Sequence, residues 1–410
     1  MTVQEILREL VGIPTPSSVS NLPLLGWVER FLQTRGWRVH RFPYNDEKGV
    51  PKANLIARPV HFTGDEQKIG LAFVCHTDTV LIAGDWKDPL RLHCPEITAT
   101  PGTGKYLHGL GACDVKGSLA CFLAALDGVS PEATDPDAAL ILTADEEVGC
   151  KGMERLLADT NLQIDSAIVS EPTSLRPAIA GKGYGLARVT INGIEAHSAF
   201  PAEGVSAISL AAHFITRVEG LLQQFSEHSN APLAANLLFD PPCTTVNVGV
   251  IDGGSAKNIV AGSCSFLVEW RPIPSDAPRA VLTELQWLAD SLRMEEPRAH
   301  IHVEPLRAEP GFARSNTGPL ELRLQEIAAQ AGRAARPRAG ISFGSEASRL
   351  ARVAGEVIVI GPGDMHTAHS EHECVPVTEL EEWTETLRAL LTARKETALA
   401  KESLEEQEQS

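Results

Sequence analysis

Residues Leu71 to Val80 read LAFVCHTDTV, and this stretch decides the fold class. Its first five residues are apolar and predict a short buried strand, with His76 and Asp78 directly after it. Side chains two residues apart lie on the same side of an extended chain. The Asp78 carboxylate can therefore accept the N–H of the imidazole nitrogen that does not bind a metal. A carboxylate commonly supports a metal-binding histidine in this way. The alternative is two polar residues in an ordinary strand-to-loop turn.

Strands alternate with helices along the first 180 residues and again near the end of the chain. The strands lack polar alternation, which is typical of a sheet covered on both faces. We therefore predict an α/β domain with a mixed, mainly parallel sheet, formed by residues 1–180 and 309–395. The expected strands are 37–42, 53–57, 71–75, 138–143, 166–169 and 356–360, and the expected helices are 2–12, 20–35, 116–126, 153–157, 319–331 and 378–394.

Residues 181–308 follow a different pattern. Apolar and polar residues alternate along 186–192, which predicts a half-exposed strand. The full order of predicted elements is β-α-β-β-α-β, the ferredoxin-like unit, so we expect an inserted domain. Its strands are expected at 186–192, 245–251, 259–270 and 300–306, and its helices at 205–222 and 277–292. Residues 396–410 are charged and poor in apolar residues, and we expect a disordered tail there.

Composition excludes several classes of protein. The 410 residues are 43% apolar, which suits two globular domains of roughly 100–200 residues each. No apolar run approaches the roughly 18 residues of a membrane span, and the N-terminus lacks signal-peptide features, so we expect a cytoplasmic protein without a membrane partner. The net charge of −17 argues against a nucleic-acid partner. The eight cysteines show no C-x-x-C spacing, which argues against a disulfide framework or a zinc finger.

Four further polar clusters stand where α/β folds place their sites, at or near strand ends. Adjacent glutamates at the end of a buried strand repel one another and ionise together only beside a cation. Asp114 precedes a predicted helix, so an N-cap aspartate is the alternative there. The four clusters contain Asp114, the pair Glu146 and Glu147, Glu171, and the pair His366 and His369.

Together these side chains suit a pair of divalent ions. Zinc takes imidazole and carboxylate ligands. Two ions roughly 3.5–4 Å apart need one bridging carboxylate and one or two private ligands each. The set leaves one carboxylate free for proton transfer, and chemistry alone leaves the choice between His366 and His369 open.

The order of the motifs carries a family resemblance. They resemble the acetylornithine deacetylase and succinyl-diaminopimelate desuccinylase family of dinuclear zinc hydrolases over nearly the whole chain. The resemblance implies a zinc-peptidase-like catalytic domain, an inserted lid and dimerisation domain, and a homodimer. The motifs are HTDTV, GLGACDVKG, TADEEVG, SEPTSLRP, GIEAHSAFP, GGSAKNIV, EWRPIP, GSEA and GPGDMHTAHSEHE.

The same resemblance implies two zinc ions per subunit, although cobalt can fill such sites. His76 and Glu171 would bind one ion, and Glu147 and His369 the other. Asp114 would bridge them. The resemblance thus selects His369 over His366, by its position before Ser370 and Glu373.

Further roles follow from the resemblance. Glu146 would be the general base and Asp78 the partner of His76. On the insert, His197 would reach the partner subunit's active site and support the oxyanion. Asn258 and Arg271 would hold the substrate, and Arg271 would bind the substrate's carboxylate. Position and charge suggest that Glu346, in GSEA, pairs with the substrate ammonium.

The implied reaction removes the acetyl group from N2-acetyl-L-ornithine, giving L-ornithine and acetate in arginine synthesis. The alternatives are an N-acetylcitrulline deacetylase, a desuccinylase, or a peptidase of the same fold. From another class, a metal-free binding protein could retain the fold. The chain departs from the family at Leu81, where many members have proline, and in GSEASRL, where close relatives have GTEAPF. No proposed ligand is missing.

Overall fold

The computed structural model describes residues 1–81, 86, 88–93, 105–228 and 235–392. The chain divides into two compact units. Unit 1 comprises Met1–Ala178, Thr317–Pro337 and Ser345–Ser410, and unit 2 comprises Ile179–Asn316 and Arg338–Gly344. The segment 338–344, which we expected in the α/β domain, belongs to unit 2 because its strand β13 (Ala339–Ile341) pairs with β7 (Ala178–Gly181). The predicted tail, residues 396–410, lies outside the described residues.

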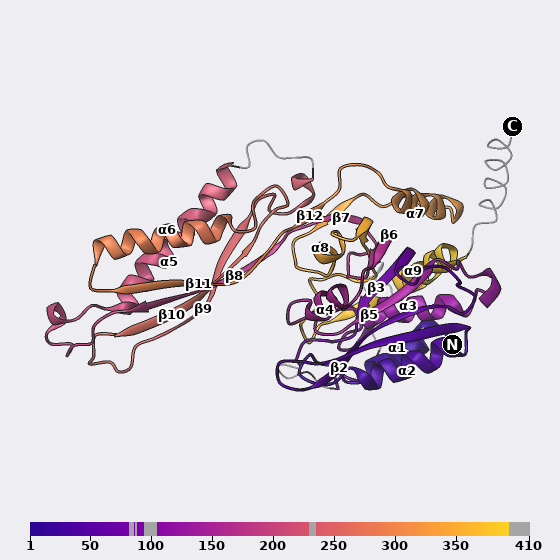
Figure 1. The fold of residues 1–410 in the computed structure, drawn as a ribbon, viewed down its shortest axis with the longest axis horizontal. Coiled ribbons are helices and arrows are strands. Elements are labelled where there is room, and N and C mark those ends of the chain that lie inside the picture. Colours follow the sequence, from indigo (N-terminus) through magenta and orange to yellow (C-terminus); the bar gives the residue numbers. More distant parts are fainter. Residues whose placement is uncertain (82–85, 87, 94–104, 229–234, 393–410) are drawn as a thin grey trace. The chain divides into compact units, whose positions relative to one another are not determined.

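Unit 1 is built on a mixed sheet of strand order β1-β2-β5-β3-β6-β14 (Figure 1). Its strands are β1 (Trp37–Asn45), β2 (Pro51–Pro59), β3 (Lys68–His76), β5 (Ala138–Thr143), β6 (Gln163–Val169) and β14 (Ala354–Val359). Strand β3 pairs in parallel with β5 and β6, and β6 with β14, whereas β1 and β2 form an antiparallel edge. The predicted mixed sheet is therefore confirmed, and its parallel strands are β5, β3, β6 and β14.

Helices cover this sheet, as its apolar strands require. They are α1 (Val3–Val11), α2 (Leu22–Gln33), α3 (Lys116–Leu126), α4 (Lys151–Asp159), α7 (Pro319–Gln330), α8 (Ala347–Leu350) and α9 (Val377–Leu391), with a 3-10 turn at Pro131–Ala133. Helix α3 packs against α1 and α9 and is buried along its whole length. On it, Phe122 stacks on Phe73 of β3 with ring centroids 4.8 Å apart. This packing joins α3 to β3 in the core of unit 1.

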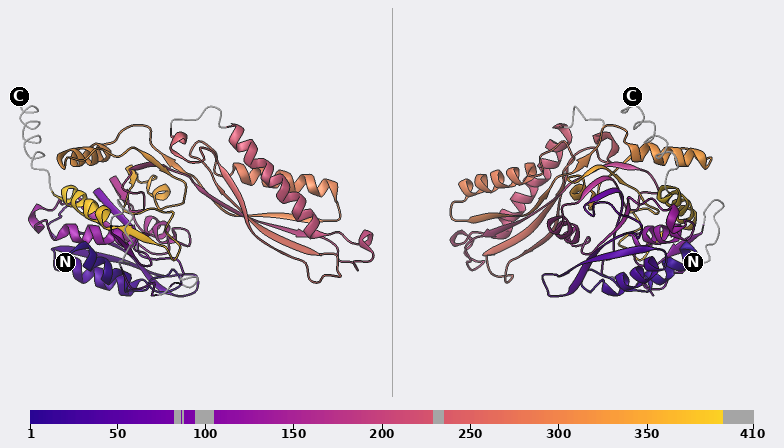
Figure 2. Two further views of the ribbon diagram at one scale, coloured as in Figure 1. Left: turned by 180° about the vertical axis from the view of Figure 1, so that it is seen from behind. Right: turned by 45° about the vertical axis from the view of Figure 1, so that its right-hand side comes forward.

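Unit 2 contains a four-stranded antiparallel sheet of order β11-β8-β10-β9 with α5 and α6 on one face (Figure 2). The elements are β8 (Tyr184–Asn192), α5 (Ala207–His228), β9 (Thr245–Gly253), β10 (Ser263–Arg271), α6 (Ala280–Glu295) and β11 (His300–Glu309). This is the predicted β-α-β-β-α-β order. Gly185 is required where β8 pairs with β10, since a Cβ there would lie 1.8 Å from the buried ring of Trp270, its partner on β10.

The remaining elements are short. Strand β4 (Tyr106–His108) pairs with β15 (Cys374–Pro376), and β12 (Phe312–Ala313) pairs with β7. Two 3-10 turns lie at Pro201–Glu203 and Asn236–Leu238. Such two- to four-residue strands have too few positions for a periodic pattern, so sequence analysis did not find them. Among the described residues, no helix is both long and apolar enough to cross a membrane.

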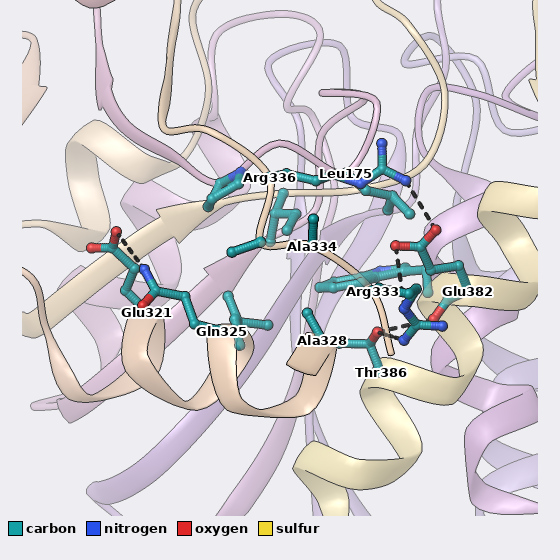
Figure 3. A pocket seen from close by; sticks show the side chains of 14 residues that line it. Leu175, Glu321, Gln325, Ala328, Arg333, Ala334, Arg336, Glu382 and Thr386 are labelled. Carbon is teal, nitrogen blue, oxygen red and sulfur yellow. Dashed lines mark hydrogen bonds and ion pairs between the residues drawn. The ribbon is translucent and has the colours of Figure 1, made fainter. Parts of the chain in front are cut away.

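A cavity in unit 1 is bordered by α7, α9 and the segment that follows α7 (Figure 3). Its arginines are engaged by the protein itself: Arg336 pairs with Glu382 at 2.9 Å, and Arg333 pairs with Glu385 at 3.1 Å. The predicted site residues do not line this cavity.

Candidate metal centre

The parallel strands of unit 1 end at one edge of the sheet, and the polar clusters follow them there. His76 is the last residue of β3, Glu146 and Glu147 follow β5, and Glu171 follows β6. Because β3 pairs with both β5 and β6, the three strand ends are neighbours. The placement agrees with the rule that α/β sheets carry their sites beyond the carboxyl ends of the strands.

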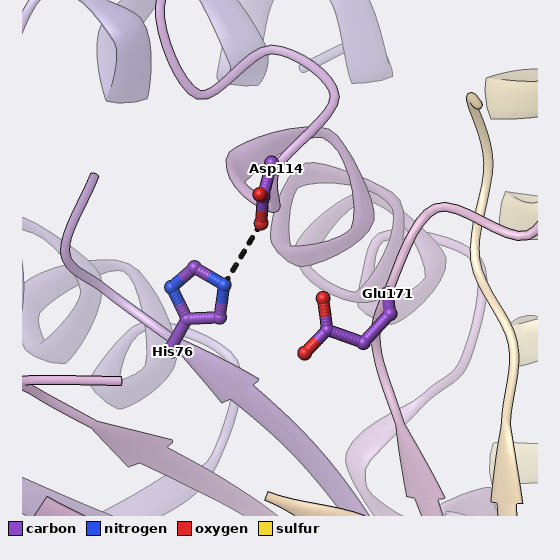
Figure 4. A group of neighbouring side chains, drawn as sticks. All are labelled: His76, Asp114 and Glu171. Atoms are coloured by element: carbon purple, nitrogen blue, oxygen red, sulfur yellow. Dashed lines mark hydrogen bonds and ion pairs between the residues drawn. The ribbon is translucent and has the colours of Figure 1, made fainter. Parts of the chain in front are cut away.

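The first ligand group consists of His76, Asp114 and Glu171 (Figure 4). Nε2 of His76 lies 3.0 Å from Oδ1 of Asp114. One ligand atom from each of the three residues lies within 4.8 Å of the others, and all three side chains are buried. An imidazole and two carboxylates at this spacing form a set of zinc-type ligands.

The second ligand group consists of Asp114, Glu147 and His369. Nε2 of His369 lies 3.0 Å from Oδ2 of Asp114 and 3.2 Å from Oε2 of Glu147. The two oxygens of Asp114 therefore face different histidines. The structure thus brings together the five predicted ligands and gives Asp114 the geometry of a bridging carboxylate.

The electrostatics of these groups call for a cation. Burial, with the nearby charges of Asp114 and Glu146, raises the pKa of Glu171 well above its usual range. Burial alone would raise the pKa of Asp114 too, but the hydrogen bonds from His369 and His76 bring it below its ordinary value. The hydrogen bonds to Asp114 and Glu147 in turn raise the pKa of His369 to about 10. The carboxylates thus need positive charge to ionise together.

A buried oxygen of Glu147 provides an independent test of whether a metal ion fits. Its Oε1 is buried and has no hydrogen-bond partner. An unsatisfied buried carboxylate oxygen is unfavourable, whereas a bound cation would satisfy it. The donor set and this oxygen both fit a divalent metal.

Glu146 stands beside the ligand groups without belonging to either. Its Oε1 accepts a hydrogen bond of 3.3 Å from the thiol of Cys150. Burial raises the pKa of Glu146 to about 8. The side chain therefore lies near the metal ligands with its carboxyl free for other chemistry.

Asp78 differs from the prediction. Nδ1 of His76 donates to the backbone carbonyl of Asp78 at 2.9 Å, while the carboxylate lies 3.8 Å away. Since the carbonyl can only accept, this bond leaves Nε2 of His76 as the ligand atom. The carboxylate accepts instead from the backbone N–H of Glu146 at 3.1 Å, that of Glu147 at 3.2 Å, and the Ser17 hydroxyl at 2.7 Å. Strand β3 ends at His76, so the alternation rule no longer holds at Asp78.

Two alternatives from the sequence can now be decided. The N-cap position of α3 is Val115, and its side chain makes no capping bond, so Asp114 is not the N-cap. Its carboxylate faces the two histidines instead. His366 is 94% exposed and bonds to Asp364, whereas His369 reaches Asp114.

Sequence analysis missed the residues that hold the segment after β5. Asp145 has a left-handed backbone conformation with φ of 59°. Its carboxylate accepts hydrogen bonds from the buried ammonium of Lys52 and, at 2.8 Å, from the Tyr44 hydroxyl. A cavity lined by Tyr44, Asp145 and Glu147 borders this segment. No sequence pattern links residues that are about 100 positions apart, so no signal was available.

The remaining predicted residues have simple local environments. His197, Asn258 and Arg271 belong to unit 2. Nδ1 of His197 accepts from the Ala199 N–H at 3.1 Å, and Arg271 pairs with Glu269 at 2.6 Å. The Asn258 backbone carbonyl accepts from the N–H of Ser198.

Glu346 lies in unit 1 and is 1% exposed. Its Oε1 has no hydrogen-bond partner, and burial raises its pKa to about 7. Like Glu147, it is a buried acid with an oxygen that a positive group could satisfy.

A mixed α/β sheet whose strand ends gather two histidines and two glutamates around a shared aspartate defines a metal-dependent hydrolase. Residues 72–393 match the model of peptidase family M20/M25/M40. The chain belongs to this family. The match spans both units and all five predicted ligands.

Curated relatives and solved structures agree with this assignment. The chain is 38% identical over 375 residues to an acetylornithine deacetylase of Myxococcus xanthus, covering 91% of this chain and 92% of that protein. It is 30% identical over 393 residues to an acetylornithine deacetylase of Yersinia pestis, covering 92% and 93%. A Staphylococcus aureus tripeptidase shares the fold with a TM-score of 0.72 and 21% identity, covering 95% and 96% of the chains. A dinuclear metal binding peptidase of Bacillus subtilis shares it with a TM-score of 0.64 and 13% identity, covering 95% and 96%.

Replacing Asp78 by asparagine should destabilise the metal-free protein by about 1.5–3 kcal/mol, because two backbone N–H groups lose a charged acceptor. Urea unfolding in the presence of a chelator measures the change. Asp46→Asn is the matched control, since Asp46 also accepts two backbone N–H bonds, but in a turn outside the core. It should show a smaller change, and equal losses in the two variants would contradict the role given to Asp78.

Proposed function

We propose that this protein removes the acetyl group from N2-acetyl-L-ornithine to give L-ornithine and acetate, a step of arginine biosynthesis in the cytoplasm. The observation that carries the proposal is Asp114, shared between His76 and His369 at 3.0 Å each, with Glu146 free beside them. The names of the M. xanthus and Y. pestis relatives support the choice of substrate.

The ligand groups suggest how two metal ions would be held. His76 and Glu171 would hold one, Glu147 and His369 the other, and Asp114 would bridge them. Imidazole and carboxylate ligands favour zinc, and cobalt suits the same donors. When bound, the ions supply Lewis acidity for the amide carbonyl and lower the pKa of water to roughly 7.

Glu146 would act as the general base. It would take a proton from the attacking water and deliver it to the leaving amine, a role worth roughly 10²–10⁴-fold in rate. Two contacts support this assignment: the Cys150 thiol bonds its carboxylate, and Asp78 holds its backbone N–H. Asp78 would thereby position both the base, Glu146, and the ligand His76.

Unit 2 would serve as lid and dimerisation domain of a homodimer. His197 would reach the partner's active site and donate to the developing oxyanion. Arg271 would hold the substrate carboxylate, a group that suits its planar guanidinium, with Asn258 beside the substrate. Closure over the substrate would exclude water.

Glu346 would pair with the distal ammonium of ornithine. Its unpartnered buried oxygen supports this role, because an ammonium group offers the donor that the carboxylate lacks. The overall net charge of −17 also favours a cationic substrate.

The purified protein should hydrolyse N2-acetyl-L-ornithine with a higher kcat/KM than other amides of similar size. Release of free amine measures the rate on N2-acetyl-L-ornithine, N-acetylcitrulline, succinyl-diaminopimelate, and a di- and a tripeptide. A preference for N-acetylcitrulline, which has no distal ammonium group, would argue against the proposed pairing of Glu346 with an ammonium group. A preference for the succinyl compound or for peptides would overturn the proposed substrate.

Glu146→Ala should bind two metal ions per chain yet lose roughly 10²–10⁴-fold in kcat, because Glu146 is the base and not a ligand. Elemental analysis and steady-state kinetics separate the two properties. Glu9→Ala, an exposed change on α1, is the control and should match the unaltered protein. A near-normal kcat for Glu146→Ala would remove Glu146 from its role.

Mixing inactive Glu146→Ala with inactive His197→Ala should restore part of the activity after subunit exchange. In a mixed dimer, one site would combine an intact Glu146 with the intact His197 of the other subunit. Each variant mixed with itself is the control. Proven exchange without any recovery counts against a role for His197 across the dimer.

A further inference from the structure

Glu373 makes contacts that no part of the proposed mechanism uses. It lies four residues after His369 and is 1% exposed. Its Oε2 accepts from the backbone N–H of Gly111 at 3.1 Å, and its Oε1 accepts from those of Cys113 at 2.9 Å and Asp114 at 3.0 Å. One buried carboxylate therefore gathers three N–H groups of the loop that carries Asp114.

The contacts join two segments that are about 260 residues apart in sequence. A second connection lies beside them, where β4 pairs with β15 and His108 stands opposite Cys374. The loop is thus tied to the segment of Glu373 on both sides of Gly111. This glycine has a φ of 76°, so the loop passes through a conformation that ordinary residues avoid.

The chain leads from Glu373 directly back to the second histidine. The N–H of Glu373 donates to the carbonyl of Ser370 at 3.1 Å, which closes a turn immediately after His369. A shift of Glu373 would therefore move His369 as well as Asp114. These are the two residues that lie 3.0 Å apart in the second ligand group.

We propose that Glu373 is a positioning residue that sets the bridging carboxylate of Asp114 in register with His369. A carboxylate can accept all three N–H bonds at once, whereas a glutamine amide has one accepting oxygen and directs its NH₂ donors at N–H groups. Groups behind the ligands commonly determine metal affinity in this way. The inference rests on the proposed metal centre, which the same experiment tests separately.

Glu356 offers a matched control. It is 2% exposed, and its carboxylate accepts from the N–H groups of Leu320 at 2.8 Å and Glu321 at 3.2 Å. These N–H groups lie at the start of α7, and this helix carries none of the proposed metal ligands. Glu356→Gln therefore makes the same chemical change to a buried carboxylate that receives backbone N–H groups, away from the metal centre.

The experiment titrates Co²⁺ into the chelator-treated full-length protein, with calorimetry and visible absorption as readouts. The unaltered protein should bind two ions. Glu373→Gln should bind Co²⁺ about 10–100-fold more weakly, with a changed absorption spectrum, because the bridging ligand is misplaced. Glu356→Gln should keep both affinity and spectrum even where its unfolding temperature falls.

Glu373→Gln with unaltered Co²⁺ affinity and spectrum would overturn the proposal and leave Glu373 a purely structural role. If that variant does not fold, the Glu373→Asp variant provides the test of the proposal. Its carboxylate is one methylene shorter and cannot reach all three N–H groups, so a smaller loss of affinity is expected, and unaltered binding overturns the proposal. Failure of the unaltered protein to bind two ions would instead overturn the metal centre itself.

Discussion

The structure of this site depends on one carboxylate that serves two imidazoles. Each oxygen of Asp114 lies 3.0 Å from a different histidine, and the two other carboxylates, Glu147 and Glu171, complete the two groups. Four charged or chargeable groups would not gather around one buried aspartate for the stability of the fold, because burial disfavours their ionisation. Cations bound between them would make the arrangement favourable.

Holding such groups in place requires fixed backbone segments on both sides of the metal centre. Asp78 binds the N–H groups of Glu146 and Glu147, and Glu373 binds those of the loop that ends at Asp114. In both cases a buried carboxylate receives backbone donors, and these bonds are stronger than neutral ones. The loops that carry the proposed ligands are thus positioned by acids that belong to neither ligand group.

Much of the fold and of the candidate site was predictable from the periodicity of the sequence and from the polar residues at the strand ends. The observed bounds of α3 and β5 coincide with the predicted 116–126 and 138–143, because both segments are buried throughout and largely apolar. The contacts of Asp78 were not predictable, since they depend on where β3 ceases to be extended. The salt bridge from Lys52 to Asp145 and the membership of 338–344 in unit 2 depend on long-range pairing that leaves no local pattern.

The adjacent residues Glu146 and Glu147 show how one turn can supply two different functions. Both backbone N–H groups bind the same Asp78 carboxylate, so the turn is fixed at two consecutive positions. The left-handed conformation of Asp145 precedes them, and the side chains then diverge: Glu147 meets His369, while Glu146 meets the Cys150 thiol. If both carboxylates faced the metal ligands, neither would be free to carry a proton. In the proposed mechanism, the divergence at this turn separates the metal ligand Glu147 from the base Glu146.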